Sequence, residues 1–379
     1  MRLKIKLYLG GIIAKLNILQ INSASFWGGG EAHLYQLSKG LIEKGHQVTI
    51  IARKNSEVVE RLSELAARIK ELPLKGAIDI ISVLEIADVI REQQIDIIHV
   101  HLGRDYWLGV LARKFVKRGK VVATRHVLFS LGKTYLHRQL YASVDRFIAV
   151  SRAVKGVLVD KNQINEERVE VIYNGVDIEE FKNEERTSLR EELGITKNEF
   201  LIGVVGRLCA RKNQEFVIEA ANRLKDSELN LKHIIVGEDS SLKKEYETRL
   251  KQLINKYSLQ DRVFLIGFRK NIAEILNILD LLVIPSLEEA FGIIALEGMA
   301  SGTPVVANKV GGLVEVIKDG ETGILTPVND INSLTEIIID LLTNQEKRDR
   351  IIKRAREEVR EKFSIEVMIN RTEELYKQL

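Results

Sequence analysis

The chain has 379 residues, of which 45% are hydrophobic, and a formal net charge of +4. A single core rarely grows beyond about 250–300 residues, so we expect two domains. The ordinary apolar content excludes a disordered chain. The single cysteine, Cys209, excludes an intrachain disulfide and is typical of a reducing compartment. Proline is scarce while Ile, Lys and Glu are abundant, which resembles a thermostable protein.

The N-terminal segment has a basic start followed by apolar residues. Lys15 interrupts the apolar part and no small-residue cleavage site follows, which argues against a signal peptide. No apolar run reaches the ~18–20 residues that a membrane-spanning helix needs. We therefore expect a cytoplasmic protein in which residues 1–15 form an extension or a short interfacial anchor.

Short apolar runs alternate with amphipathic stretches through the first half. A helix is predicted over 31–44, with leucines on one side and Gly45 at its end. Alternating strands and helices imply a parallel sheet that is covered on both faces. Strands are predicted at 16–22, 47–52, 96–101, 120–126, 146–151 and 169–175.

The same pattern then restarts, with helices predicted over 213–224 and 243–257. Strands are predicted at 200–206, 232–237, 263–267, 281–285, 303–308 and 323–326. The fold class is therefore α/β, with two doubly wound Rossmann-like domains at 1–177 and 178–360, and a final helix at 361–379 that packs back on the first domain. Ligands of such sheets bind outside the carboxyl ends of the strands, so we expect the active site in a cleft between the domains.

The most informative stretch is PSLEEAFGIIALEGMASGTPVVA, residues 285–307, which begins where a predicted strand ends. Glu289 lies in the loop at the ligand edge of the sheet, and Glu297 lies one to two turns into the following helix. Carboxylates accept hydrogen bonds from paired sugar hydroxyls. Phe291-Gly292-Ile293 opens the helix, where backbone N–H groups can meet sugar or phosphate oxygens.

This stretch resembles the donor-site signature of the retaining GT-B glycosyltransferases of glycosyltransferase family 4. The resemblance extends over nearly the whole chain from Leu16 onward. It implies the GT-B fold, a nucleotide-sugar donor such as a UDP- or GDP-sugar, and no metal or other cofactor. It also implies that Glu297 holds the ribose hydroxyls, while Glu289 and the backbone at Phe291, Gly292 and Ile293 contact the donor sugar.

Two further segments fit the same family. Arg207 and Lys212 follow the first strand of the second domain, and by resemblance they hold the diphosphate. Fixed cations there would stabilise the charge that grows on a departing nucleoside diphosphate. A glycine loop at residues 28–31 separates the first strand from its helix, and Gly29 and Gly30 are the expected contacts to the donor phosphate.

His126 ends the fourth strand of the first domain and matches a family histidine near the donor sugar and phosphate. Arg207, Lys212, Glu289 and His126 are therefore the expected catalytic groups. Gly311-Gly312 with Glu315 matches a later loop of the family and is interpreted chiefly as part of the cleft. His99 and His101 share a face of a strand, but two ligands fall short of the four of a structural zinc site, so no metal is predicted.

The acceptor is expected to contact the first domain, with Arg104, Trp107, Arg125 and His126 as candidates. Basic residues exceed acidic ones in the first half, and they are densest over 113–120. This segment is either a solvated helix face or a patch for the anionic cytoplasmic face of a membrane, and both interpretations stay open. No aromatic-and-basic RNA motif is visible, so nucleic acid is not an expected partner.

The predicted function is transfer of a hexose-type sugar, with retention, from a nucleotide diphosphate sugar to a glycan or lipid-linked acceptor in cell-envelope polysaccharide synthesis. A sucrose- or trehalose-type synthase or a phosphorylase on the same fold is an alternative. A non-catalytic protein that binds a nucleotide sugar or nucleic acid is another.

Overall fold

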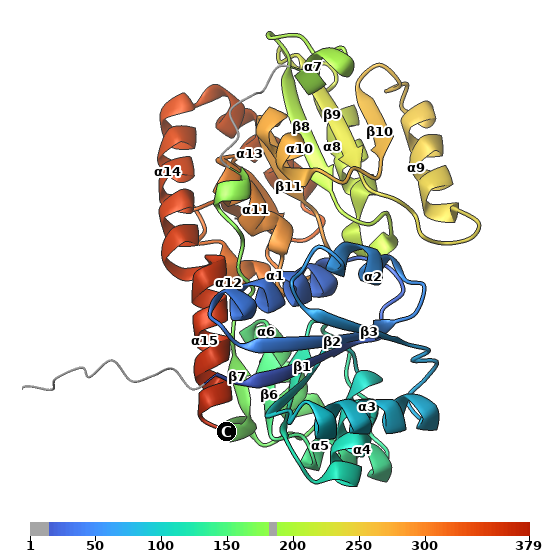
Figure 1. Cartoon of the computed structure of the whole chain (residues 1–379). Helices are drawn as coiled ribbons and strands as arrows, with labels where there is room; N and C mark the ends of the chain where they lie inside the picture. Colours follow the sequence, from blue (N-terminus) through green and yellow to red (C-terminus); the bar gives the residue numbers. More distant parts are fainter. Residues whose placement is uncertain (1–14, 182–187) are drawn as a thin grey trace, which may run out of the picture. The chain divides into compact units, whose positions relative to one another are not determined.

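The computed structural model describes residues 15–181 and 188–379 (Figure 1). The expected extension over 1–15 therefore lies almost entirely outside the described residues. The chain divides into two compact units. The first contains the described residues up to Ala123, together with Ser143–Asp145 and Leu379, and the second contains Thr124–Ala142 and Arg146–Gln378. The predicted domain limits at 177 and 360 stay predictions.

The first sheet has the strand order β3-β2-β1-β4-β5-β6-β7, and the boundary between the two units falls within β5. The pairings of β1 with β2 and β4, of β2 with β3, of β4 with β5 and of β6 with β7 are parallel. Its strands are β1 (Asn17–Asn22), β2 (Gln47–Arg53), β3 (Arg68–Leu72), β4 (Ile97–Val100), β5 (Lys120–Arg125), β6 (Arg146–Ala149) and β7 (Val169–Val171).

The second sheet has the order β10-β9-β8-β11-β12-β13, and all of its pairings are parallel. Its strands are β8 (Phe200–Val205), β9 (Leu231–Val236), β10 (Val263–Gly267), β11 (Leu281–Ile284), β12 (Val305–Asn308) and β13 (Ile324–Thr326). Both sheets share the doubly wound order in which the chain reverses direction next to the first strand. The predicted fold class, two Rossmann-like sheets, is confirmed.

Helices flank each sheet (Figure 1). Those from the first half are α1 (Gly29–Glu43), α2 (Glu57–Leu62), α3 (Ile80–Glu92), α4 (Asp105–Val116), α5 (Tyr135–Ala142) and α6 (Arg152–Gly156). The others are α7 (Ser188–Glu192), α8 (Gln214–Leu224), α9 (Glu245–Lys256), α10 (Ile272–Ile278), α11 (Ile293–Ser301), α12 (Leu313–Val316), α13 (Ile331–Thr343), α14 (Gln345–Lys362) and α15 (Ile365–Lys377).

In the second sheet the central strands β8 and β11 are largely buried and carry apolar runs, as a parallel sheet covered on both faces requires. In the second unit the inner side chains of β8 and β11 pack with α8 and α13 in one core cluster, and a second cluster joins α8 to α9. The last helix, α15, contacts the end of the first sheet, where the Arg371 guanidinium lies 3.5 Å from a Glu170 carboxylate oxygen of β7.

The strand β3 was not predicted from the sequence, because its residues RIKEL form no apolar run and only Leu72 is buried. The strand predicted at 303–308 begins two residues later, at Val305. Thr303 belongs to the turn after α11, where its hydroxyl donates to the Leu276 carbonyl at 2.7 Å.

Candidate active site

The crossover point of the second sheet lies between β8 and β11, and the loops after these two strands carry the predicted donor residues. In doubly wound sheets ligands bind at this point, outside the carboxyl ends of the strands. The loop after β11 is held by Asn308, whose side-chain amide donates to the carbonyls of Pro285 at 2.8 Å and Ser286 at 3.2 Å. The loop after β8 is joined to it by a backbone hydrogen bond of 2.8 Å from Leu287 N–H to the Arg211 carbonyl.

Lys212 and Glu289 come together between these two loops. The Lys212 ammonium forms an ion pair with Glu289, and the Ser286 hydroxyl lies 3.3 Å from the same carboxylate oxygen. The side chains are 27% and 15% exposed, so the pair is partly shielded but open to a ligand. Arg207 lies in the same loop and is exposed, while its carbonyl accepts from Gln214 at 2.9 Å.

Glycines let the backbone at Glu289 pack closely against the loop after β12. Gly311 has a φ of +48°, and a Cβ there would lie 2.0 Å from the Glu289 carbonyl oxygen. The N–H of Gly312 donates to that same oxygen at 2.9 Å. Gly292 has a φ of +98° immediately before α11 and would place a Cβ 2.6 Å from Leu313. The Gly311-Gly312 segment therefore sets the position of Glu289.

Glu297 lies within α11 and is only partly exposed. Burial, together with the nearby charge of Glu180, raises the pKa of its carboxyl group to about 7. Glu180 belongs to a short 3-10 helix, Glu179–Phe181, which the sequence analysis did not connect with this site. A carboxyl group in this state changes its charge near neutral pH.

Phe291 is buried, and its ring stacks on Tyr173 with centroids 5.7 Å apart. The phenol of Tyr173 donates to Glu315 at 3.0 Å, and the Glu315 carboxylate also accepts from the N–H groups of Arg152 and Ala153 at the start of α6. Glu315, which the sequence placed in a loop, lies within α12 and accepts hydrogen bonds from the start of α6.

Ser151, which precedes α6, has two contacts that hold the same region. Its hydroxyl donates to the Ala290 carbonyl at 2.6 Å and accepts from Val154 N–H at 3.1 Å. Ser151 and Tyr173 were missed by the sequence analysis. A serine shortly after a strand is a signal for a helix cap, but Ala290, which accepts from this hydroxyl, is 139 residues away in the chain.

In the first unit the glycine loop leads into α1. Gly28 precedes the helix, Gly29 and Gly30 are its first two residues, and Gly29 is exposed. Glu31 is buried, and its carboxylate accepts from the Asn22 side-chain amide at 3.1 Å. The expected phosphate contacts are therefore at the start of a 15-residue helix, whose first N–H groups suit an anion.

The acceptor candidates of α4 differ in what they contact. The Arg104 guanidinium donates to both the hydroxyl and the carbonyl of Ser23. Ser23 also contacts the buried carboxyl of Asp105, whose pKa is raised to about 7 by burial. Arg104 therefore holds the loop after β1, and both Arg104 and Trp107 are partly exposed.

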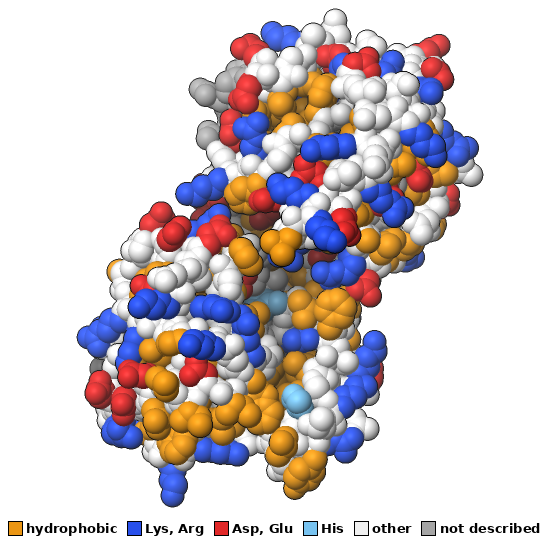
Figure 2. Space-filling model, turned by 90° about the vertical axis from the view of Figure 1, so that its right-hand side faces the viewer, with side chains coloured by type: hydrophobic (Ala, Val, Ile, Leu, Met, Phe, Trp, Pro, Cys, Tyr) orange, Lys and Arg blue, Asp and Glu red, His pale blue; other side chains and the backbone are white. Residues whose placement is uncertain are grey.

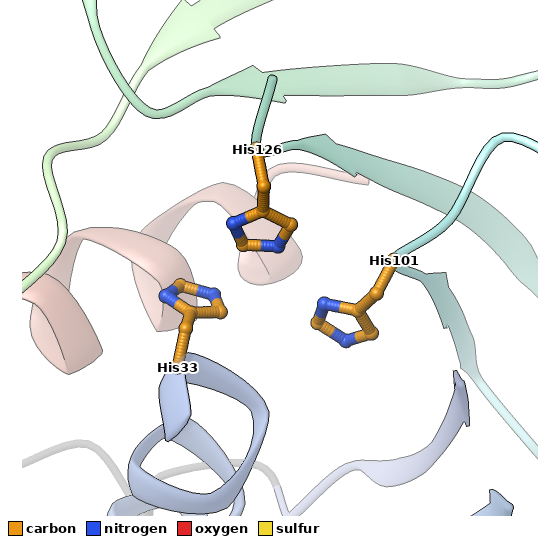
Figure 3. A group of neighbouring side chains, drawn as sticks. All are labelled: His33, His101 and His126. Atoms are coloured by element: carbon orange, nitrogen blue, oxygen red, sulfur yellow. The ribbon is translucent and has the colours of Figure 1, made fainter. Parts of the chain in front are cut away.

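Arg125 and His126 lie at the end of β5. Arg125 is buried, and its guanidinium donates to the Phe129 carbonyl. His126 is partly exposed. In the first unit the ring centroids of His33 and His101 lie 5.8 Å apart (Figure 3). His99, which the sequence paired with His101, has its ring centroid 4.4 Å from that of His101.

None of the helices in the described parts of the chain has both the length and the apolar character that crossing a bilayer requires.

Comparison with known proteins identifies the family. Residues 27–180 match the model described as Glycosyltransferase Family 4, and residues 185–358 match Glycosyl transferases group 1. The chain belongs to the family 4 type of GT-B glycosyltransferases, as the motif around Glu289 and Glu297 predicted.

Similar proteins extend over most of the chain. It is 28% identical to an N-acetyl-alpha-D-glucosaminyl L-malate synthase of Bacillus anthracis, over 90% of this chain and 91% of that protein. It is 26% identical to a UDP-Gal:alpha-D-GlcNAc-diphosphoundecaprenol alpha-1,3-galactosyltransferase of Escherichia coli, over 79% of each. The crystal structure of a Rickettsia africae glycosyltransferase superposes with a TM-score of 0.87 at 25% identity, covering 96% of this chain and 98% of that one.

Proposed function

We propose that this chain transfers a hexose-type sugar, with retention of configuration and without a metal, from a UDP- or GDP-sugar to a glycan or lipid-linked acceptor. The observation that carries the proposal is the Lys212–Glu289 pair at the crossover of the second sheet, with Glu297 on the adjoining helix. The relative from Escherichia coli is named for a UDP-galactose donor and a diphosphoundecaprenol-linked acceptor, which supports the same classes here.

The donor would use the two loops and α11 in distinct ways. Glu297 accepts from the ribose hydroxyls, while Glu289 and the backbone at residues 291–293 contact the sugar. Arg207 and Lys212 bind the phosphates, and Gly29 and Gly30 add helix N–H groups to an anion. When the donor binds, its diphosphate becomes a second anionic partner of the Lys212 ammonium. A sugar hydroxyl then donates a hydrogen bond to the Glu289 carboxylate.

The chemical step breaks the anomeric C–O bond to the nucleoside diphosphate. The transition state is oxocarbenium-like, and negative charge builds on the leaving phosphate, where Lys212 and Arg207 stabilise it. In the proposed same-face attack the acceptor hydroxyl forms the new bond, and its proton passes to the leaving phosphate. His126 lies near the donor sugar in this proposal and orients it.

A donor panel tests the proposal. Purified protein is incubated with UDP-glucose, UDP-N-acetylglucosamine or GDP-mannose, and Tm and nucleotide release are measured. The true donor at 100 times its Kd is expected to add about 2.7 kcal/mol to the free energy of unfolding. If none of these donors binds at millimolar concentration, the proposed donor class is wrong. Release of sugar phosphate that requires inorganic phosphate and no nucleotide would favour a phosphorylase instead.

We also propose peripheral contact with an anionic membrane on the cytoplasmic face, through the adjacent helices α3 and α4. Three cations of the basic segment 113–120 form ion pairs with Asp145 or Asp96. Lys114 and Lys117 are exposed, and Phe115 between them is 64% exposed. Isoleucines at the start of α3, Ile80 and Ile81, are exposed as well. The face drawn in Figure 2 shows hydrophobic side chains among Lys and Arg, a combination suited to a membrane interface.

Liposome co-sedimentation tests this contact. Replacing Lys114 by Ala and Lys117 by Asn, which tolerates the positive φ of that position, removes two exposed charges. At about 1 kcal/mol for each cation near the surface, binding to phosphatidylglycerol vesicles should weaken by roughly 10- to 30-fold. The matched control removes two exposed lysines of the second unit, Lys225 and Lys353. Equal binding of both variants would contradict the assignment to α4.

A further inference from the structure

Arg125 is a buried cation without an anionic partner. It is the last residue of β5, belongs to the second unit, and has a side chain that is only 9% exposed. In the described parts of the chain its guanidinium donates to the Phe129 carbonyl and forms no ion pair, and its Nε atom is buried without a hydrogen-bond partner. The sequence has no aspartate or glutamate between Asp105 and Asp145. The charge of this guanidinium is therefore left uncompensated.

The side chain that senses this charge most clearly is neutral. Burial raises the pKa of the Tyr141 phenol to about 12, although the nearby charge of Arg125 acts in the opposite direction. The phenol keeps its hydrogen at neutral pH and donates it at 3.0 Å to the Gly132 carbonyl, in the loop after β5 (residues 127–134). A buried charge without a counter-ion is costly, because the protein interior solvates it poorly. An anion that binds to Arg125 would offset this cost.

The loop after β5 does not depend on Arg125 for its position. The buried side-chain amide of Asn162 bonds to Leu131 in both directions. Its Oδ1 atom accepts from the Leu131 N–H at 3.2 Å, and its Nδ2 atom donates to the Leu131 carbonyl at 3.0 Å. The Tyr141 phenol holds the next residue of the loop. A purely structural Arg125 would thus add one contact to a loop that is already fixed, at the cost of a buried charge.

The position and chemistry of Arg125 suit a ligand. In doubly wound sheets ligands bind outside the carboxyl ends of the strands, which is where Arg125 lies. The chain reaches the surface directly afterwards, since His126 is partly exposed and Val127 is 38% exposed. A guanidinium presents its N–H groups as a planar fork that matches two oxygens of a carboxylate or a phosphate. The unpartnered Nε is part of that fork.

We propose that Arg125 binds an oxyanion, a phosphate or carboxylate group, that belongs to the acceptor substrate. The acceptor is thereby narrowed to one that carries a negative charge. The proposed function places the neighbouring His126 near the donor sugar, so this charge would lie close to the accepting hydroxyl. Assignment of the oxyanion to the acceptor rests on the proposed function, whereas its binding by Arg125 does not. Binding is therefore measured without donor or acceptor.

The experiment titrates the full chain with inorganic phosphate and, separately, with succinate. Chloride holds the ionic strength constant, because salt alone screens charges. Phosphate also suits the cations proposed for the donor, so the parent protein is the Arg207→Ala/Lys212→Ala variant. Calorimetry and Tm are expected to show binding of at least one probe, and the tighter probe identifies the group as phosphate or carboxylate. If neither probe binds at about 50 mM, where even a weak site adds to Tm, the proposal is overturned.

Arg125→Met, added to this parent, replaces the guanidinium by an apolar side chain. It is expected to weaken oxyanion binding at least 10-fold, the usual effect of losing a charged hydrogen bond. Its ligand-free Tm should stay the same or rise, because replacing buried charges by apolar side chains is often neutral or stabilising. The matched control is Arg138→Met, which removes an exposed arginine of α5 and should bind as the parent does.

Equal affinity with and without Arg125→Met would overturn the proposal, and a lowered Tm in that variant would then assign Arg125 to holding the loop. If Arg125→Met does not fold, Arg125→Lys takes its place, since it keeps the charge and loses the fork. Arg125→Lys is expected to weaken binding at least about 3-fold, and unchanged binding would likewise overturn the proposal. Arg125-dependent oxyanion binding in a protein that binds none of the donors would withdraw only the assignment to the acceptor.

Discussion

Replacing Lys212 by Ala is expected to lower kcat about 100- to 1000-fold, the usual cost of removing one group that stabilises a developing anion. The ammonium lies against Glu289 at the crossover of the second sheet, where the proposed function places the leaving diphosphate. Ground-state affinity for the donor should change much less, because Arg207 still contacts the phosphates. Steady-state kinetics with the donor found in the panel measures both quantities.

The control for this variant is Lys243→Ala, which removes a lysine that is 83% exposed and weakly paired with Glu245. It should leave kcat and Tm unchanged, since exposed ion pairs contribute little to stability. The double variant Lys212→Ala/Glu289→Gln separates the two roles: if Lys212 acted only by neutralising Glu289, the second change would restore turnover. Normal turnover in the Lys212→Ala variant would contradict the phosphate assignment.

Donor affinity is expected to fall as the pH is lowered through about 7, because the pKa of Glu297 is raised to about 7. Only the carboxylate form can accept from both ribose hydroxyls, and protonation removes charged hydrogen bonds of about 1.5–3 kcal/mol each. Nucleotide Kd should therefore rise by roughly 10-fold or more between pH 8 and pH 5.5. Glu297→Gln should bind the nucleotide weakly at both pH values and lose this pH dependence. Isothermal titration calorimetry at several pH values measures the effect.

The same shift has a consequence for stability that is independent of any ligand. In the folded protein the Glu297 carboxyl group keeps its proton to a higher pH than in the unfolded chain, where its pKa is near the ordinary glutamate value of 4.5. Between these two values the folded state binds more protons, so its stability falls as the pH rises through about 7. Glu297→Gln should therefore raise Tm at pH 8 more than at pH 5. The control Glu219→Gln alters an exposed glutamate of α8 and should show neither effect; a pH profile shared by both variants would exclude Glu297 as its source.

In the second sheet, apolar runs in the sequence predicted the bounds of the strands to within a few residues. The apolar runs at 200–206 and 281–285 became β8 and β11 with their carboxyl ends where the sequence placed them. These strands were predictable because a parallel strand buried on both faces needs an unbroken apolar run. The edge strand β3 was not predictable, because its residues are mostly exposed and charged.

The ends of the strands and helices depended on side-chain contacts that the local sequence pattern does not show. The strand predicted at 146–151 ends at Ala149, because Ser151 accepts from Val154 N–H and begins α6. Glu315 was placed in a loop of the cleft from its motif, but its hydrogen bonds to Arg152 and Ala153 cross 163 and 162 residues of chain. Such contacts arise only once both segments are folded.

The sequence by itself determined the fold class, the family and the identity of the donor motif, because these depend on residue type and on spacing along a few turns of chain. The tertiary structure decided which motif residues meet. Lys212 and Glu289 are 77 residues apart and pair because β8 and β11 are neighbours in the sheet. The raised pKa of Glu297 likewise needs its burial and the charge of Glu180.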